Sequence, residues 1–170
     1  MKEAIQALLK SDKMVHAFEY LKNDESHTID QQIELVQISS FSPHEEKRAE
    51  RFKELLTEAG LDPVMDEVHN VYAHIHGTGD GPTLYASAHL DTVFPPETPL
   101  PVKREGTKIY APGIGDDTRG LAEILTLARA IKESGLKPVG DIIIGGNVGE
   151  EGLGDLRGMR HFFSKNADKV

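Results

Sequence analysis

Two apolar segments with a helical segment between them limit most strongly how this 170-residue chain can fold. Thr83–His89 and Asp141–Val148 are short and apolar, which predicts two buried strands. Between them, apolar residues recur at three- and four-residue steps over Leu121–Ile131, the pattern of a buried helix that ends near Gly135. Strands that alternate with helices indicate a layered α/β fold, and the Thr83–His89 strand is expected in the middle of its sheet.

The rest of the chain predicts further helices and short strands. Residues 1–38 are expected to be largely helical, with a break near Asn23–Ser26. Ser42-Pro43-His44-Glu45 predicts the start of a helix, with the serine as N-cap, the proline at the first helical position and the glutamate in the place of a capping box. This helix is expected to end near Gly60, and it is followed by predicted strands at 64–68 and 71–75, a hairpin at 102–110 and a helix beginning near 159.

Composition excludes several kinds of protein. A length of 170 residues suits one domain with a sizeable core. The lack of cysteine excludes disulfides and thiolate zinc sites, and the formal net charge of -9 argues against a nucleic-acid partner. The sequence has no long apolar run and no signal-like beginning, so we expect no membrane span and a cytoplasmic location.

Three clusters of acidic or imidazole side chains stand where the predicted strands end or a helix begins. They are His89-Leu90-Asp91, Asp116-Asp117 and Glu150-Glu151. Ligand crevices of open α/β sheets lie outside the carboxyl ends of the strands, so these clusters are expected to share one crevice. Singly, they suit a strand-end hydrogen bond, a helix cap and a solvated turn. Together, an imidazole and several carboxylates without a thiol make a nitrogen and oxygen site of the kind that zinc, cobalt or manganese accepts.

The spacing within two clusters suggests a division of roles. On extended backbone, His89 and Asp91 lie on one face, so Asp91 can order the imidazole or a nearby water. Adjacent Glu150 and Glu151 allow one carboxylate to bind metal while its neighbour handles a proton.

Three segments also resemble the N-terminal signature blocks of the M20 zinc peptidases, which include carboxypeptidases, aminoacylases, tripeptidases and deacylases. The segments are Ser87–Val93, Gly115–Gly120 and Gly149–Gly152. The resemblance implies a three-layer α/β/α catalytic domain around a mainly parallel or mixed sheet. It also implies two divalent metal ions, zinc being favoured over cobalt or manganese.

The same resemblance assigns a role to each residue of the clusters. It implies that His89 binds one metal ion, Asp116 bridges both and Glu151 binds the second. It also implies that Asp91 orients His89 and that Glu150 is the general base. The peptide bond between Asp116 and Asp117 is expected to be cis.

The chain lacks part of the family pattern. Family members have a further carboxylate ligand beyond the paired glutamates, a final histidine and commonly an inserted lid domain that dimerises. Here Val170 follows Glu151 by nineteen residues (170 − 151), and His161 and Asp168 stand in no recognisable block. Residues 1–170 are therefore expected to be the N-terminal part of a metallopeptidase catalytic domain, with the lid domain and the C-terminal part of the catalytic domain absent.

The function that this implies is hydrolysis of an amide bond in a small peptide or an N-acyl amino acid, with a homodimer as a compatible form of the intact enzyme. One alternative is a non-catalytic fragment or interaction module that keeps the fold but lacks a complete metal site. Another is a mononuclear amidase that uses His89 and nearby carboxylates.

Other candidate sites have simpler interpretations. His74-x-His76 is expected on an exposed strand, and His44 and His161 are expected at the surface. The glycine-rich Gly77–Gly81 has no helix directly after it, so a phosphate-binding loop is not expected.

Overall fold

A four-stranded mixed sheet organises the computed structural model, which describes residues 2–170. The strands are β1 (Val64–Met65), β2 (Val71–Ile75), β6 (Ile142–Asn147) and β3 (Leu84–His89), in that spatial order. β2 is antiparallel to both β1 and β6, whereas β3 is parallel to β6, with His89 opposite Asn147. A separate hairpin of β4 (Lys103–Glu105) and β5 (Lys108–Tyr110) confirms the predicted one.

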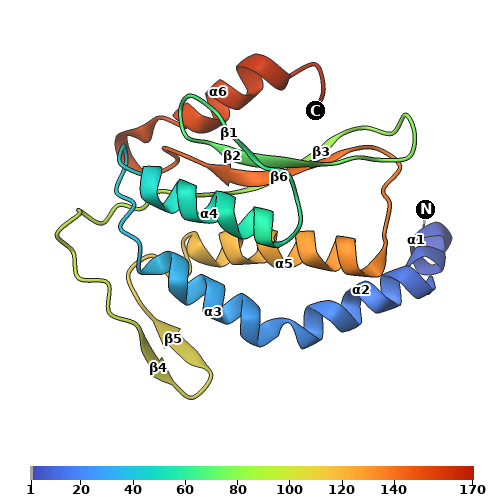
Figure 1. Ribbon diagram of the computed structural model, residues 1–170, viewed down its shortest axis with the longest axis horizontal. Helices are drawn as coiled ribbons and strands as arrows, with labels where there is room; N and C mark the ends of the chain where they lie inside the picture. Colours follow the sequence, from blue (N-terminus) through green and yellow to red (C-terminus); the bar gives the residue numbers. More distant parts are fainter. Residues whose placement is uncertain (1) are drawn as a thin grey trace.

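Helices cover both faces of the sheet. They are α1 (Lys2–Leu9), α2 (Asp12–Asn23), α3 (Glu25–Val36), α4 (Glu46–Glu58), α5 (Thr118–Ser134) and α6 (Arg157–Asn166), with a short 3-10 turn at Gly152–Gly154. Figure 1 shows α6 on one face and α4 and α5 on the other, with α2 and α3 beyond α5. The predicted three-layer α/β/α arrangement with a mixed sheet is therefore confirmed, and α1, α2 and α3 add a further helical layer.

The core lies between the sheet and helices α4 and α5. Its fully buried side chains come from both helices and from the strands, among them Phe52, Leu56, Leu121, Leu125, Val71 and Ile144. The apolar residues of α5 recur at helical spacing and form the buried face, as expected from the sequence. This packing places the N-terminal ends of α4 and α5 beside the carboxyl ends of β3 and β6.

The predicted central position of the Thr83–His89 strand is wrong. Among residues 2–170, β3 pairs only with β6 and forms one edge of the sheet. Its faces are covered only in part: Ala88 packs in the core against α5 and Tyr85 stacks on Phe162 of α6, whereas Leu84 and Ser87 are exposed. Helices can cover the two faces of an edge strand as well as those of a central strand. An apolar sequence therefore does not show whether a strand lies at the edge or in the middle of its sheet.

The helix predicted to start at Ser42 begins later, at Glu46. Ser42 and Pro43 form a turn joined by a cis peptide bond, and Glu45 makes no capping hydrogen bond. The capping box fails because the buried Glu45 carboxylate accepts hydrogen bonds from Gly149 and Arg157 instead. Tertiary partners thus replace the local ones that the sequence pattern suggested.

The predicted helical segment 1–38 divides into three helices in the described part of the chain. The expected break falls at Asp24, between α2 and α3, and another lies at Lys10–Ser11. Met1, which the prediction included, lies outside the described residues. Within residues 2–170, every helix is too short or too polar to cross a membrane.

Candidate metal centre

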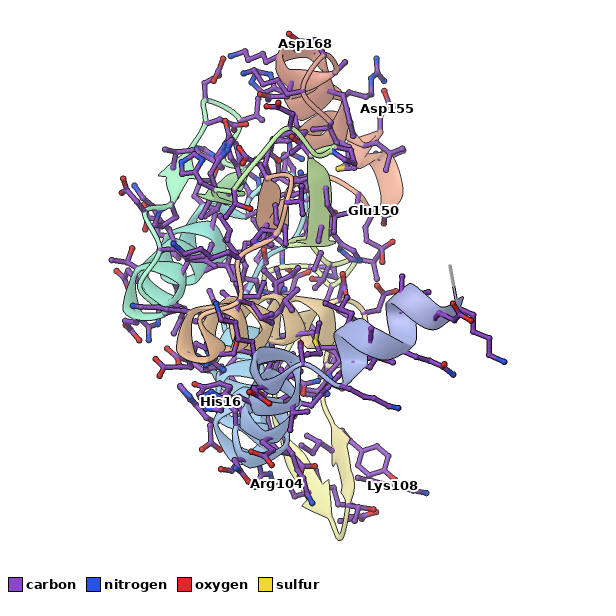
Figure 2. The ribbon with its side chains drawn as sticks, turned by 90° about the vertical axis from the view of Figure 1, so that its right-hand side faces the viewer. His16, Arg104, Lys108, Glu150, Asp155 and Asp168 are labelled. Carbon is purple, nitrogen blue, oxygen red and sulfur yellow. The ribbon has the colours of Figure 1, made fainter. Side chains whose placement is uncertain are left out.

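The three predicted clusters meet at the carboxyl ends of β3 and β6. His89 is the last residue of β3, and Glu150 and Glu151 follow β6 after a turn at Gly149. Asp116 precedes the first turn of α5. Because β3 and β6 are parallel, the segments that follow them leave the sheet at the same end, where both strands finish. Figure 2 shows the side chain of Glu150 directed outward at the periphery of the molecule, and the residue is exposed.

His89, Asp116 and Glu151 converge on one small volume. One nitrogen or oxygen atom of each lies within 4.8 Å of the corresponding atoms of the other two. His89 Nε2 is 2.8 Å from Asp116 Oδ1, and His89 Nδ1 is 3.0 Å from the backbone oxygen of Asp91. The imidazole is therefore held through both ring nitrogens.

Charge around the imidazole favours its protonated form. Burial opposes the positive charge, but hydrogen bonds to Asp91 and Asp116 outweigh it and raise the pKa of His89 to about 9. Burial and then the nearby charge of Asp116 raise the pKa of Glu151 above its usual range. A bound cation would relieve the crowding of the carboxylates.

Asp91 ties the end of β3 to the glutamate loop. Its side chain is fully buried, and its two oxygens accept the backbone N–H groups of Glu150 and Glu151 at 2.9 and 2.8 Å. Burial tends to raise the pKa of Asp91, but the contacts with His89 and with these N–H groups lower it below its usual range. Asp91 was predicted to orient His89; its backbone oxygen lies 3.0 Å from the ring, and its carboxylate holds the loop of Glu150 and Glu151.

Asp117 links His89 to the start of α5. One of its oxygens accepts the Gly120 N–H at 3.1 Å as the N-cap of α5, and the other accepts the His89 N–H at 3.1 Å. The peptide bond between Asp116 and Asp117 is cis, as the resemblance implied. Asp116 projects its exposed side chain toward His89, whereas Asp117 fixes the backbone beneath it.

Two buried charges, Arg48 of α4 and Glu45 at its N-cap, support the site, and the sequence did not lead us to expect this role for them. Arg48 donates to the backbone oxygens of Ile38 and Leu90, and burial lowers its pKa to about 10 against the attraction of Asp91. Glu45 accepts from Gly149. A signal was available, because both fall at helical spacing from the buried Ala49 and Phe52, where a charge needs a buried partner.

The donor set fits a divalent ion. An imidazole nitrogen and two carboxylate oxygens are usual ligands of zinc at about 2.0–2.2 Å, and the 4.8 Å limit leaves room for an ion among them. Glu151 also borders a cavity of about 500 Å³ that is open to solvent. Most of the other lining residues are apolar or small, including Phe41, Pro43, Val93 and Leu153.

A second group of potential ligands lies near α6. His161 was expected at the surface, but its Nε2 atom is buried, without a hydrogen-bond partner, near Asp66 and Glu67. The Asp66 carboxylate already accepts from Val68 and Asn70, and Glu67 pairs with Lys165. These contacts make the group a structural network. His74 and His76 are exposed, as expected, and His76 lies 3.4 Å from Asp141.

Comparisons with known proteins agree with the signature segments. Residues 85–170 match the model of peptidase family M20/M25/M40. An uncharacterized Bacillus subtilis protein, YqjE, is 30% identical over 142 residues, which are 75% of this chain and 37% of the relative. Carboxypeptidase G2 of a Pseudomonas species is 38% identical over 84 residues, 48% of this chain and 20% of the relative.

A solved structure has the same fold over most of the chain. A tripeptidase from Staphylococcus aureus aligns with 32% identity and a TM-score of 0.63, over 74% of this chain and 37% of the tripeptidase. The chain therefore spans between about a fifth and two fifths of the length of each of these proteins.

Proposed function

The chain belongs to peptidase family M20/M25/M40, and from this we propose that it is part of a metal-dependent hydrolase that cleaves an amide bond in a small peptide or an N-acyl amino acid. Residues 1–170 would form the N-terminal part of its catalytic domain. The observation that carries the proposal is the convergence of His89, Asp116 and Glu151 within 4.8 Å.

His89, Asp116 and Glu151 would hold two divalent metal ions, with Asp116 shared between them and zinc favoured over cobalt or manganese. Ions of this kind lower the pKa of a water ligand toward neutrality and polarise a carbonyl oxygen. Hydrogen bonds would hold these ligands in place. The Asp91 backbone oxygen and the Asp117 carboxylate hold His89, and the Asp91 carboxylate holds the backbone of Glu151.

Glu150 would act as the general base. It is exposed and directly precedes the proposed ligand Glu151, and the Asp91 carboxylate fixes its backbone N–H. It would accept a proton from water as the water attacks the amide carbon, and would then give the proton to the leaving amine nitrogen. The cavity beside Glu151 would accept an apolar side chain of the substrate.

The test combines metal analysis with a substrate panel. We expect purified protein in its longest native form to contain two metal ions per chain and to hydrolyse dipeptides, tripeptides or N-acyl amino acids. Removal of metal by a chelator should abolish hydrolysis, and added zinc or cobalt should restore it. Full activity with one metal ion per chain would instead indicate a mononuclear amidase.

A second candidate is a non-catalytic module that retains the fold. The observation in its favour is that the converging ligand group found in residues 2–170 holds only three residues. A well-folded protein that neither binds metal nor hydrolyses any member of the panel would support this candidate.

For the intact protein we further propose a cytoplasmic homodimer, which cell fractionation and light scattering would test.

A further inference from the structure

The glutamate loop is held by two buried carboxylates. Three consecutive backbone N–H groups, those of Gly149, Glu150 and Glu151, all point toward carboxylates rather than toward solvent. Asp91 accepts the last two, and Glu45 accepts the first at 3.1 Å. Glu45 thus holds Gly149, the residue directly before the proposed base Glu150 and two residues before the proposed metal ligand Glu151.

Glu45 has no role in α4 that would explain its burial. Its side chain is 0% exposed, yet it makes no capping hydrogen bond. Its second oxygen accepts from Arg157 at 2.6 Å, and Arg157 also donates to the hydroxyl of Ser42. A buried carboxylate is stable only when it is paired and hydrogen-bonded, and both partners of Glu45 belong to the segment around the glutamate pair.

Close packing makes the loop sensitive to this pair. Gly149 has a φ of +65°, and a Cβ atom there would lie 2.3 Å from Arg157 Nη1. The Arg157 side chain therefore packs directly against the Gly149 backbone while its guanidinium pairs with Glu45. Loss of the Glu45 charge would therefore disturb both side chains that confine Gly149, which are those of Glu45 and Arg157.

We propose that Glu45 is a positioning residue, which fixes the backbone of Glu150 and Glu151 through Gly149 and Arg157. The metal-dependent part of this inference rests on the proposed function. Glu45 itself contacts neither the ligand group nor the cavity, so its influence passes through the loop.

The first test is hydrogen exchange of the metal-free chain in the variant Glu45→Gln. Glutamine keeps the size of the side chain but removes the charge that pairs with Arg157. We expect the amides of Gly149, Glu150 and Glu151 to exchange at least about tenfold faster than in the wild type. We also expect zinc affinity, measured by competition with a chelator, to fall by about tenfold, within the range seen when the supports of metal ligands are lost.

The matched control is Asp24→Asn. Asp24 and Arg129 form another ion pair of low exposure, at 2.5 Å, which joins the junction of α2 and α3 to α5. This variant should lose a similar amount of thermal stability but keep wild-type zinc affinity and wild-type exchange of the Gly149–Glu151 amides. If Glu45→Gln behaves like this control, Glu45 is only structural and the inference is overturned.

A second variant covers the case in which Glu45→Gln does not fold. Arg157→Gln removes the partner charge from a side chain that is 29% exposed, and it should also accelerate exchange of the Gly149 amide. Unchanged exchange in that variant would overturn the inference. If the wild type binds no zinc, the proposed function fails, and the exchange measurements still decide whether Glu45 positions the loop.

Discussion

His89 Nε2 lies 2.8 Å from Asp116 Oδ1, so the end of β3 meets the turn before α5 directly, although 27 residues separate the two side chains. In the metal-free chain, a proton on the ring satisfies this contact. A metal ion at Nε2 would need the lone pair that this proton occupies, so protonation and metal binding compete. The pH therefore affects both the stability of the fold and the proposed metal affinity.

The metal-free chain should become less stable between about pH 6.5 and 9. The pKa of His89 is about 9 in the folded chain and about 6.5 when unfolded. Below pH 6.5 the imidazole is charged in both states and its contribution is fully present; above pH 9 it is neutral in both and the contribution is lost. We expect the free energy of unfolding, measured by urea denaturation with a chelator present, to fall by at most about 3 kcal/mol.

The control for this prediction is His89→Gln, in which the decrease across this pH range should be absent. Metal affinity should show the opposite trend in the wild type, because the ion that His89 binds displaces the imidazole proton below pH 9. Cobalt affinity should rise by up to about tenfold per pH unit from pH 7 to 9. A cobalt affinity that stays constant over this range would contradict the assignment of His89 as a ligand.

Replacing Asp91 by Asn should loosen the glutamate loop and lower stability. The asparagine oxygen can accept one N–H, whereas its NH₂ group would face the other, so one buried N–H of Glu150 or Glu151 would lose its partner. We expect a loss of about 1–3 kcal/mol in the free energy of unfolding. Asp141→Asn is the control, because Asp141 accepts the Gly77 N–H at an exposed position, so its replacement should cost less stability than Asp91→Asn.

Asp117→Ala should destabilise the chain through α5 and through β3 together. It removes the N-cap contact with Gly120 and the acceptor for the His89 N–H, so we expect a loss of about 1–3 kcal/mol by thermal or urea unfolding. Ser11→Ala is the matched control. Ser11 stands at the N-cap of α2 without making a capping hydrogen bond, so its replacement should change stability by less than about 0.5 kcal/mol. Equal losses in the two variants would contradict the role of Asp117.

Local patterns predicted most elements of the fold and the meeting of the three clusters, whereas the choice of His89, Asp116 and Glu151 within those clusters came from the family resemblance. Strands, helices and turn residues place His89, Asp116 and Glu151 at element ends, and the parallel pairing of β3 and β6 brings those ends together. The sequence did not predict that β3 lies at an edge of the sheet, because the apolar sequence of a strand does not show which strands lie beside it. It also missed the partners of Glu45 and Asp91, which come from segments 104 and 59 residues away, respectively.

Glu150→Gln and Glu151→Gln should separate proton transfer from metal binding. Glu150 lies outside the converging group, so Glu150→Gln should keep the wild-type metal content while kcat falls by about 10²–10⁴-fold through loss of the proposed base. Glu151→Gln should instead weaken metal binding, seen as a lower metal content after dialysis, because a neutral amide replaces a carboxylate ligand. The control is Glu123→Gln, which removes an exposed partner of Arg119 on α5 and should leave kcat and metal content unchanged. Near-normal kcat in Glu150→Gln would rule out Glu150 as the base, and full metal content in Glu151→Gln would rule out Glu151 as a ligand.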